Sequence, residues 1–297
     1  MSDSPQELLR RHGLKPKHSW GQNFLGDDYA LSSIAEGLHL SPGETVVELG
    51  PGLGHLTRHL LATGARVVAV ERDRDMVRVL ESLELEGLTL VPGVNFAEVA
   101  GTSPVAVAGN LPYHLTSPIL FQVLEQRSTI SRAVFTLQAE VVTRLAAGPG
   151  SRDYGLLSAL LGLFFHVEQL AHLPAHLFHP PPRVDSAVVG LSTLAKPRAP
   201  ITDDARFIRV VKAGFAQRRK TLINSLRSDT GLGDVETVRA ALERAGIDPG
   251  RRAETLAPEE FAALERELPP FDAGKGAKSG RVLGQKKADR SAGDEVP

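Results

Sequence analysis

The chain has 297 residues and no cysteine, and its 34 Lys and Arg against 35 Asp and Glu give a formal net charge of -1. At roughly 150 residues per domain, this length fits one large or two smaller domains. Without cysteine there are no disulfides, thiolate metal sites or cysteine nucleophiles. The longest uncharged apolar stretch, Gly155 to Phe165, is shorter than the roughly 20 residues of a membrane helix, and no secretory signal is visible. We therefore expect a cytoplasmic protein with no membrane contact; the near-neutral charge, taken alone, argues against nucleic-acid binding.

Short Val-rich runs bounded by Gly or Pro predict buried strands in the first 200 residues. We expect these strands at 45–49, 66–70, 88–91, 105–109, 133–137 and 187–191. Between the first two, Leu53, Leu56, Leu60 and Leu61 have the spacing of an amphipathic helix, which Gly64 would end. A strand, a helix and a strand in this order predict a βαβ unit, and hence an α/β fold with a mostly parallel, doubly wound sheet.

The Pro-containing segment 195–200 resembles a linker, and only helical patterns follow it up to about residue 268. The sequence therefore predicts an α/β domain over 1–197 and a small all-helical domain over 201–271. Residues 272–297 are polar and glycine-rich, and we expect a disordered tail there.

A glycine loop follows the first predicted strand. Gly50, Gly52 and Gly54 lie between a strand and a helix, where a ligand can approach the backbone closely. Glu71 stands 21 residues after Gly50, at the end of the next strand, where a carboxylate can accept both hydroxyls of an adenosine ribose. The spacing is G-x-G-x-G rather than the dinucleotide G-x-G-x-x-G, and Glu48 would repel a pyrophosphate. The pattern favours S-adenosylmethionine over NAD; a tight turn with a surface glutamate is the plainer alternative.

The turn Asn110-Leu-Pro-Tyr113 follows the fourth predicted strand and should face the same crevice as the glycine loop. The Asn110 side-chain oxygen and the Leu111 carbonyl could accept the two N–H groups of an exocyclic amine, and the Tyr113 ring could stack on its base. Positioning of this kind carries most of the rate in methyl transfer to such an amine. The alternative is an ordinary Asn-x-Pro turn with a packed tyrosine.

Together, these motifs resemble the small-subunit ribosomal RNA adenine dimethyltransferases (the KsgA/RsmA family), in unbroken order from residue 12 to about 268. KHSWGQNFL at 17–25 resembles the family's N-terminal element over the cofactor, and FHPPPRVDS at 178–186 resembles the loop whose Phe helps to sandwich the target base. The segments 215–226 and 252–256 resemble the helical C-terminal domain.

The resemblance implies a Rossmann-like class I methyltransferase with a seven-stranded sheet, whose α/β domain binds S-adenosylmethionine and whose helical domain binds RNA. It implies transfer of two methyl groups to N6 of each of two adjacent adenines, in a hairpin loop near the 3′ end of small-subunit (16S) rRNA. The expected partner is the immature small ribosomal subunit, and a monomer is expected. The adenine would be handled by Asn110, Leu111, Pro112, Tyr113 and Phe178. The expected cofactor contacts are Gln22, Asn23, Leu25, Glu48, Gly50, Gly52, Leu53, Glu71, Arg72, Asn95 and Asn110.

The chain departs from the family pattern after the third predicted strand. The family usually has an Asp there that contacts the cofactor adenine amine, whereas this chain has Val94 or Asn95 at that place. The side-chain oxygen of Asn95 could still accept from an amine.

Seven basic residues and no acid occur between 205 and 228, which predicts an RNA-contacting helical surface despite the neutral total. They are Arg206, Arg209, Lys212, Arg218, Arg219, Lys220 and Arg227. No metal site is expected, because neither His55 with His59 nor the later histidines have a third ligand in register.

Three other functions stay open. The chain could be an adenine methylase of large-subunit rRNA of the antibiotic-resistance type, a non-catalytic rRNA-binding assembly factor, or an NAD-dependent oxidoreductase. The glycine spacing and Glu48 disfavour the last of these.

Overall fold

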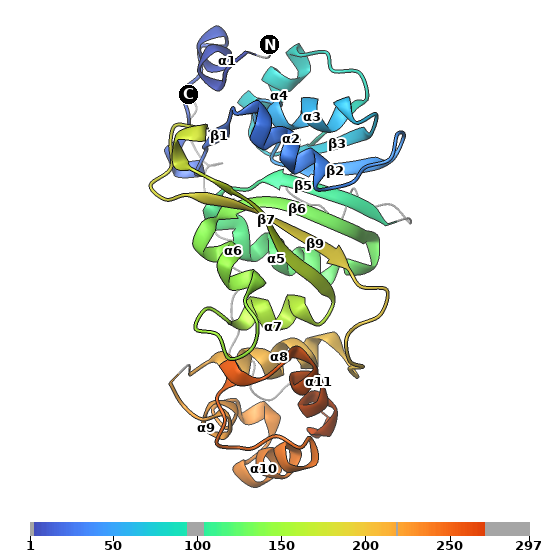
Figure 1. Cartoon of the computed structure of the whole chain (residues 1–297), viewed down its shortest axis with the longest axis vertical. Coiled ribbons are helices and arrows are strands. Elements are labelled where there is room, and N and C mark those ends of the chain that lie inside the picture. Colours follow the sequence, from blue (N-terminus) through green and yellow to red (C-terminus); the bar gives the residue numbers. More distant parts are fainter. Residues whose placement is uncertain (1–2, 94–103, 218, 271–297) are drawn as a thin grey trace, which may run out of the picture.

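The computed structural model describes residues 3–93, 104–217 and 219–270. An α/β part forms the upper portion of the molecule in Figure 1, and a smaller helical part lies below it. The strands are β1 (Phe24–Leu25), β2 (Thr45–Leu49), β3 (Arg66–Glu71), β4 (Leu88–Pro92), β5 (Val105–Asn110), β6 (Ile130–Gln138), β7 (Phe165–Leu173), β8 (Phe178–His179) and β9 (Ser186–Thr193). The α-helices are α1 (Pro5–Arg11), α2 (Asp28–Glu36), α3 (His55–Ala62), α4 (Arg74–Ser82), α5 (Thr116–Glu125), α6 (Ala139–Ala146), α7 (Leu156–Gly162), α8 (Asp204–Phe215), α9 (Leu222–Leu226), α10 (Val235–Arg244) and α11 (Pro258–Glu267). Within these ranges, no helix has the length and apolar character needed to cross a membrane.

The main sheet has seven strands in the order β4-β3-β2-β5-β6-β9-β7. The strands from β4 to β6 pair in parallel, and β9 pairs antiparallel with both of its neighbours. This confirms the predicted mostly parallel, doubly wound, seven-stranded sheet. The strand order reverses between β2 and β5, so the carboxyl ends of these two strands open onto one crevice.

All six predicted strands are present, but the strand β7 was not predicted. It lies at the edge of the sheet, and exposed side chains occupy most of its length, including His166, Glu168 and Gln169. A polar edge strand of this kind lacks the apolar run or clean alternation on which strand prediction depends. The strands β1 and β8, of two residues each, are too short to carry any periodicity.

The two faces of the sheet have separate cores because successive strand residues point to opposite sides. Val46 and Val67 belong to the cluster that packs against α2 and α3, whereas Val47 and Val107 belong to the cluster with α5, α6 and α7. The apolar stretch from Gly155 becomes α7, whose Leu160 is fully buried.

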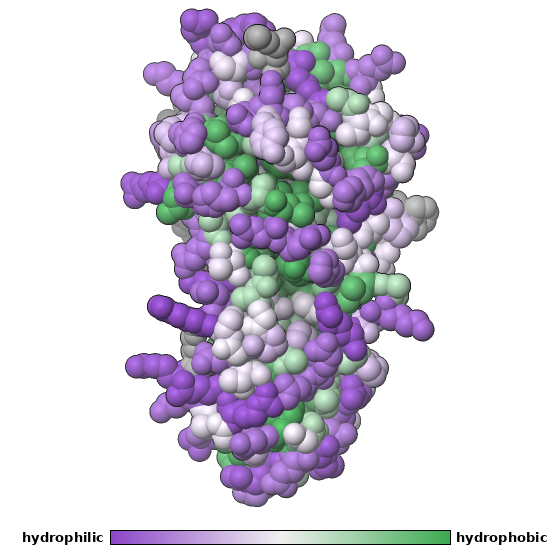
Figure 2. Space-filling view, in the orientation of Figure 1, coloured by the Kyte–Doolittle hydropathy of each residue, from purple (hydrophilic) through white to green (hydrophobic). Residues whose placement is uncertain are grey.

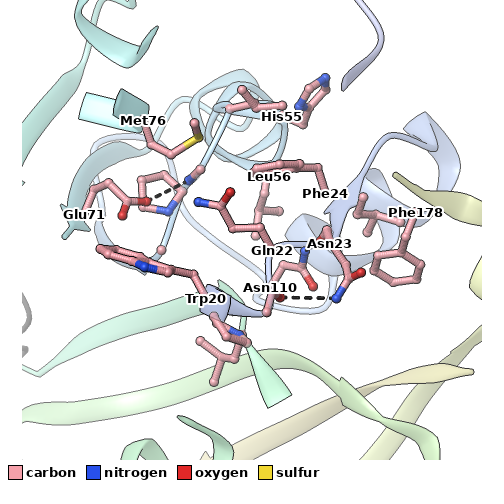
Figure 3. Close-up of a pocket in the computed structure, with 18 of the residues that line it drawn as sticks. Trp20, Gln22, Asn23, Phe24, His55, Leu56, Glu71, Met76, Asn110 and Phe178 are labelled. Carbon is pink, nitrogen blue, oxygen red and sulfur yellow. Dashed lines mark hydrogen bonds between the residues drawn. The ribbon is translucent and has the colours of Figure 1, made fainter. Parts of the chain in front are cut away.

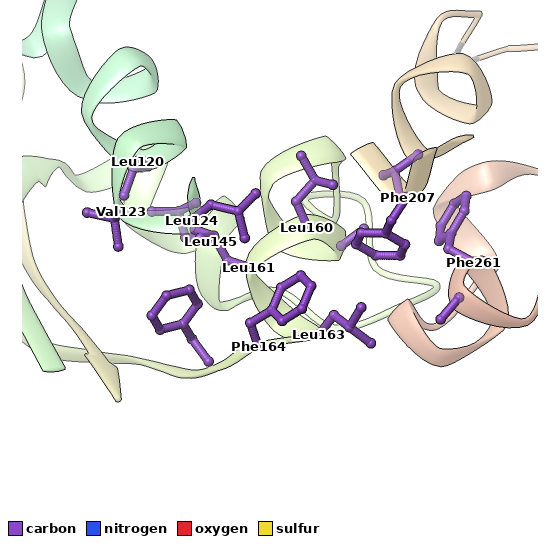
Figure 4. Packing of buried hydrophobic residues seen from close by; sticks show 14 of the residues in the cluster. Leu120, Val123, Leu124, Leu145, Leu160, Leu161, Leu163, Phe164, Phe207 and Phe261 are labelled. Carbon is purple, nitrogen blue, oxygen red and sulfur yellow. The ribbon is translucent and has the colours of Figure 1, made fainter. Parts of the chain in front are cut away.

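The second of these cores continues into the helical part (Figure 4). Phe164, after α7, meets Phe207 of α8 edge to face, with ring centroids 5.9 Å apart. Phe207 and Phe261 of α11 are both fully buried. The domain boundary predicted near 197–201 falls between β9 and α8, but the hydrophobic core runs across it.

On the face shown in Figure 2, hydrophobic residues gather mainly over the upper and middle portions, and hydrophilic residues dominate the helical end. This is the surface character expected of an end that meets water or a charged partner rather than an apolar one.

We expect Phe207→Ala and Phe261→Ala each to lower the free energy of unfolding by about 3–5 kcal/mol, because each empties a fully buried site. Because one core joins the two parts, calorimetry should show a single transition that shifts as a whole. Val184→Ala, at a residue that is 47% exposed, is the control and should change little. A variant in which only one of two separate transitions moves would contradict the shared core.

Candidate active site

A pocket opens where the carboxyl ends of β2, β3 and β5 meet (Figure 3). It encloses about 820 Å³ of space between protein atoms, the open mouth included. Its walls come from residues 20–25, the glycine loop 50–53, the end of β3 and the turn after β5. A pocket at the topological switch point of an open α/β sheet is where such folds bind their ligands.

Most of the predicted site residues meet in this pocket, although they come from distant parts of the sequence. Its lining contains all five residues assigned to the adenine: Asn110, Leu111, Pro112, Tyr113 and Phe178. Of the remaining predicted cofactor contacts it contains Gln22, Asn23, Leu25, Glu48, Gly50, Gly52, Leu53 and Glu71.

Two predicted cofactor contacts are not in the lining. The side chain of Arg72 lies against Trp20, with the guanidinium carbon 5.2 Å from the ring centroid. Asn95 lies outside the described residues. The lining also includes residues that sequence reasoning did not select, among them Trp20, Phe24 and Met76. The position of Trp20 inside the KHSWGQNFL segment was the signal that could have found it.

The glycine loop adopts a conformation that side chains would obstruct. Gly50, Gly52 and Gly54 have φ angles of 66°, 56° and 80°, in the left-handed region that glycine favours. A Cβ on Gly52 would lie 3.0 Å from the Phe24 ring, and the Gly52 N–H donates to Glu71 Oε2 at 3.1 Å. The loop therefore presents bare backbone to the pocket.

Two buried carboxyl groups face this backbone. Glu48 is 1% exposed and accepts a hydrogen bond from Thr57 Oγ1 at 2.6 Å; burial raises its pKa to about 8. Burial also raises the pKa of Glu71, against the lowering effect of the N–H groups of Asp73 and Gly52 that it accepts. Desolvation of the charged form is the main cause in both cases. A ligand that places a cation or hydroxyl groups beside these carboxylates would offset the free-energy cost of desolvating their charged forms.

The segment 17–25 is fastened over the pocket by a cluster of polar contacts. Lys17 Nζ lies 2.6 Å from Asp73 Oδ1 and from Asp75 Oδ2, and these contacts raise the pKa of Lys17. Gln22 Nε2 donates to Asp73 Oδ2 at 2.7 Å, and Gln22 Oε1 accepts from the Lys17 backbone N–H at 2.9 Å. The amide of Gln22 therefore holds the segment against the start of α4.

The turn after β5 is positioned by two further contacts. Asn110 Nδ2 donates to the Asn23 carbonyl at 2.9 Å, which leaves the amide oxygen of Asn110 as its acceptor atom (Figure 3). The hydroxyls of Tyr113 and Ser186 share a hydrogen bond of 2.8 Å. Phe178, which is buried, lies in β8, and β8 pairs antiparallel with β1.

The basic run was expected on a helical surface, and the structure shows that it extends beyond a single helix. Arg206, Arg209 and Lys212 lie in α8, Arg219 and Lys220 in the connection after it, and Arg227 directly after α9. Arg206 pairs with buried Glu265 at 2.8 Å, and Arg209 Nε donates to Asp229 at 2.7 Å, so both hold the helical part together. Lys212 lies over the Phe121 ring at 4.8 Å. Arg219, Lys220 and Arg227 are exposed, and Arg218 lies outside the described residues.

The histidines of α3 have partners of their own. His55 Nε2 lies 2.9 Å from the Asp3 carbonyl, and burial lowers its pKa. His59 contacts Ser32 and Asp28 of α2. Over the described ranges, no group of three or more potential ligands is arranged for a metal ion.

We expect the contribution of Glu48 to the stability of the protein to fall as pH rises from 5 to 8. In this range the unfolded chain has released the Glu48 proton and the folded protein still holds it, which costs up to about 1.4 kcal/mol per pH unit. Glu48→Gln should remove this contribution, so its unfolding free energy relative to wild type should rise with pH in denaturant titrations. Glu36→Gln, at an exposed residue of α2, is the control. Parallel curves for wild type and Glu48→Gln would contradict the shifted pKa.

Comparison with known proteins agrees with this arrangement. The family model for "Ribosomal RNA adenine dimethylase" matches residues 13–269. The chain is 66% identical over 273 residues to "Ribosomal RNA small subunit methyltransferase A" of Myxococcus xanthus (strain DK1622), covering 91% of this chain and 96% of that protein.

Solved structures show the same fold. The 23S rRNA methyltransferase ErmE is 30% identical with a TM-score of 0.63, over 83% of this chain and 99% of that chain. A dimethyladenosine transferase from Plasmodium falciparum has a TM-score of 0.69 at 23% identity, over 81% of this chain and 95% of that chain. The chain belongs to the ribosomal RNA adenine dimethylase family and is an rRNA methyltransferase that uses S-adenosylmethionine.

Proposed function

We propose that the chain converts two adjacent adenines, in a hairpin loop near the 3′ end of small-subunit rRNA, into N6,N6-dimethyladenosine. It would act in the cytoplasm as a monomer on the immature small ribosomal subunit. The observation that carries the proposal is the position of Asn110. Its amide nitrogen is bound to the Asn23 carbonyl, so its oxygen is left to accept an amine hydrogen beside the pocket's two buried acids.

The pocket residues fit S-adenosylmethionine. The bare backbone at Gly50 and Gly52 allows close approach, the Glu71 carboxylate can accept ribose hydroxyls, and buried Glu48 suits the positive amino group. A cation beside Glu48 would lower its raised pKa and recover part of the cost of burying it. When bound, the cofactor supplies an electrophilic methyl group on its sulfonium sulfur.

The residues of the turn after β5 would prepare the adenine for the reaction. The Asn110 oxygen and the Leu111 carbonyl accept the two N6 hydrogens, which localises the nitrogen lone pair and aims it at the methyl carbon. The ring of Tyr113, anchored by Ser186, packs on the base, and Phe178 would take part from the opposite wall. In such a transfer the N–C bond would form as the C–S bond breaks, and N6 would then lose a proton to water. Alignment supplies most of the rate.

One assay separates this proposal from its alternatives. The protein is incubated with labelled S-adenosylmethionine and either immature small subunits or large-subunit rRNA, and the methyl groups per adenine are counted. Two methyl groups on each of two small-subunit adenines would support the proposal. Methylation of large-subunit rRNA alone would assign an ErmE-like activity, and binding without methylation would assign an assembly factor.

We expect Tyr113→Ala to lower kcat/KM for the RNA by about 10- to 100-fold, because stacking on a base is lost. The affinity for S-adenosylhomocysteine should stay within a few-fold of wild type by calorimetry. Tyr29→Ala, at an 83% exposed residue of α2, is the control and should retain activity. Equal losses of catalysis and cofactor binding would show that Tyr113 acts only through the fold.

RNA binding is expected from the exposed members among the described residues of the basic run, Lys212, Arg219, Lys220 and Arg227, rather than from Arg206 and Arg209, whose ion pairs lie within the helical part. We expect Arg219→Glu with Lys220→Glu to weaken RNA binding and to flatten the plot of log K against log salt by about 0.7–0.9 per lost phosphate contact. Cofactor affinity should not change. Arg239→Glu, at an exposed residue of α10, is the matched control. An unaltered salt slope would refute the contact.

A further inference from the structure

We infer that Trp20 forms an aromatic wall against the adenosyl group of the methyl donor and so contributes to cofactor selection. The inference rests on the proposed cofactor site in the pocket. Trp20 is the only tryptophan in the chain. Its side chain lines the pocket and yet the residue is 37% exposed, although a tryptophan gains most from full burial. A flat, partly apolar ligand would cover the surface that the protein leaves open.

The position of Trp20 within the pocket identifies the adenosyl group as that ligand. Figure 3 places Trp20 and Glu71 at the same end of the pocket, away from Phe178. Arg72, the residue directly after Glu71, lies against the indole at 5.2 Å. If Glu71 holds the ribose, the base attached to that ribose lies within reach of Trp20. The target adenine would enter at the other end, between Tyr113 and Phe178.

The indole is held by neighbours that are themselves fixed. Lys17 lies 5.3 Å from the ring centroid, and the same ammonium is bound to Asp73 and Asp75. Gly21, directly after Trp20, has a φ of 65°, and a Cβ there would lie 3.2 Å from the His114 ring. The turn at Gly21 therefore sets the direction of Trp20, and only glycine makes it without strain.

An aromatic contact with the adenine is also relevant to residues 94 and 95, where this chain lacks the family's usual Asp. The resemblance implies an Asp that binds the adenine amine in related proteins, and this chain has Val94 or Asn95 at that place in the sequence. Contact with an aromatic ring recognises the flat face of the base and needs no carboxylate. Trp20 would thus supply binding that does not depend on residue 95.

Fluorescence and calorimetry with the full chain test this inference, with S-adenosylhomocysteine as the probe. Binding should change the emission of wild-type protein, because Trp20 is its sole tryptophan. Trp20→Ala should weaken binding by roughly 10-fold or more, as for the loss of a base–aromatic stack, and Trp20→Phe should restore most of it. The loss should be similar for 5′-methylthioadenosine, which keeps the adenosyl group and lacks the amino acid. Tyr29→Ala is the matched control.

Kinetics separate a failure of this inference from a failure of the proposed function. Trp20→Ala should raise KM for S-adenosylmethionine while kcat at saturating cofactor and RNA affinity stay near wild type. A wild type that methylates small-subunit rRNA, beside a Trp20→Ala variant with unchanged cofactor KM, would overturn the inference alone. A loss of RNA affinity with normal cofactor binding would overturn it by assigning Trp20 to the RNA. If wild type neither binds the probe nor methylates rRNA, both proposals fail.

Discussion

The antiparallel pairing of β1 with β8 joins the two walls of the pocket, and the geometry of the site depends on it. Leu25 lies opposite Phe178 and Phe24 opposite His179, so the segment over the glycine loop is bonded to the segment that carries Phe178. The carbonyl of the adjacent Asn23 accepts a hydrogen bond from the side-chain amide of Asn110. A displacement of residues 17–25 would therefore disturb the proposed cofactor wall, the proposed amine acceptor Asn110 and the proposed base contact Phe178 together, and methyl transfer tolerates little misplacement.

The other end of this segment is fixed by charge rather than by backbone pairing. Asp73 is 2% exposed and receives both the Lys17 ammonium and the Gln22 amide. Asp73 also caps α4 by accepting the Asp75 N–H, so α4 and the segment share one anchor. Two different kinds of interaction thus restrain a short stretch of chain whose own regular structure is one 3-10 turn, His18–Trp20, and the two-residue strand β1.

Sequence patterns predicted what is local and missed what depends on distant partners. The central strands and the helix after the glycine loop were found because their apolar spacing is complete within a few residues. The pairing of β1 with β8 could not be predicted, because a two-residue strand shows no periodicity and its partner strand lies far along the chain. The basic run was counted correctly, but its helix ends at Phe215. No sequence pattern near Arg206 indicates that its ion-pair partner is Glu265 of α11.

Burying the carboxyl groups of Glu48 and Glu71 lowers the stability of the free protein, and a bound ligand can offset this loss. Thr57 donates one hydrogen bond to Glu48, and a glutamine could accept the same bond without the free-energy cost of keeping a carboxyl group protonated near neutral pH. A purely structural role would therefore favour the amide at position 48. Glu71 is different, since the N–H groups of Gly52 and Asp73 already compensate part of its charge and fix its direction. One acid thus suits a cation and the other an aligned pair of hydroxyls, which is the combination that an S-adenosyl ligand presents. Sites of this kind give up stability in the free protein in exchange for selective binding.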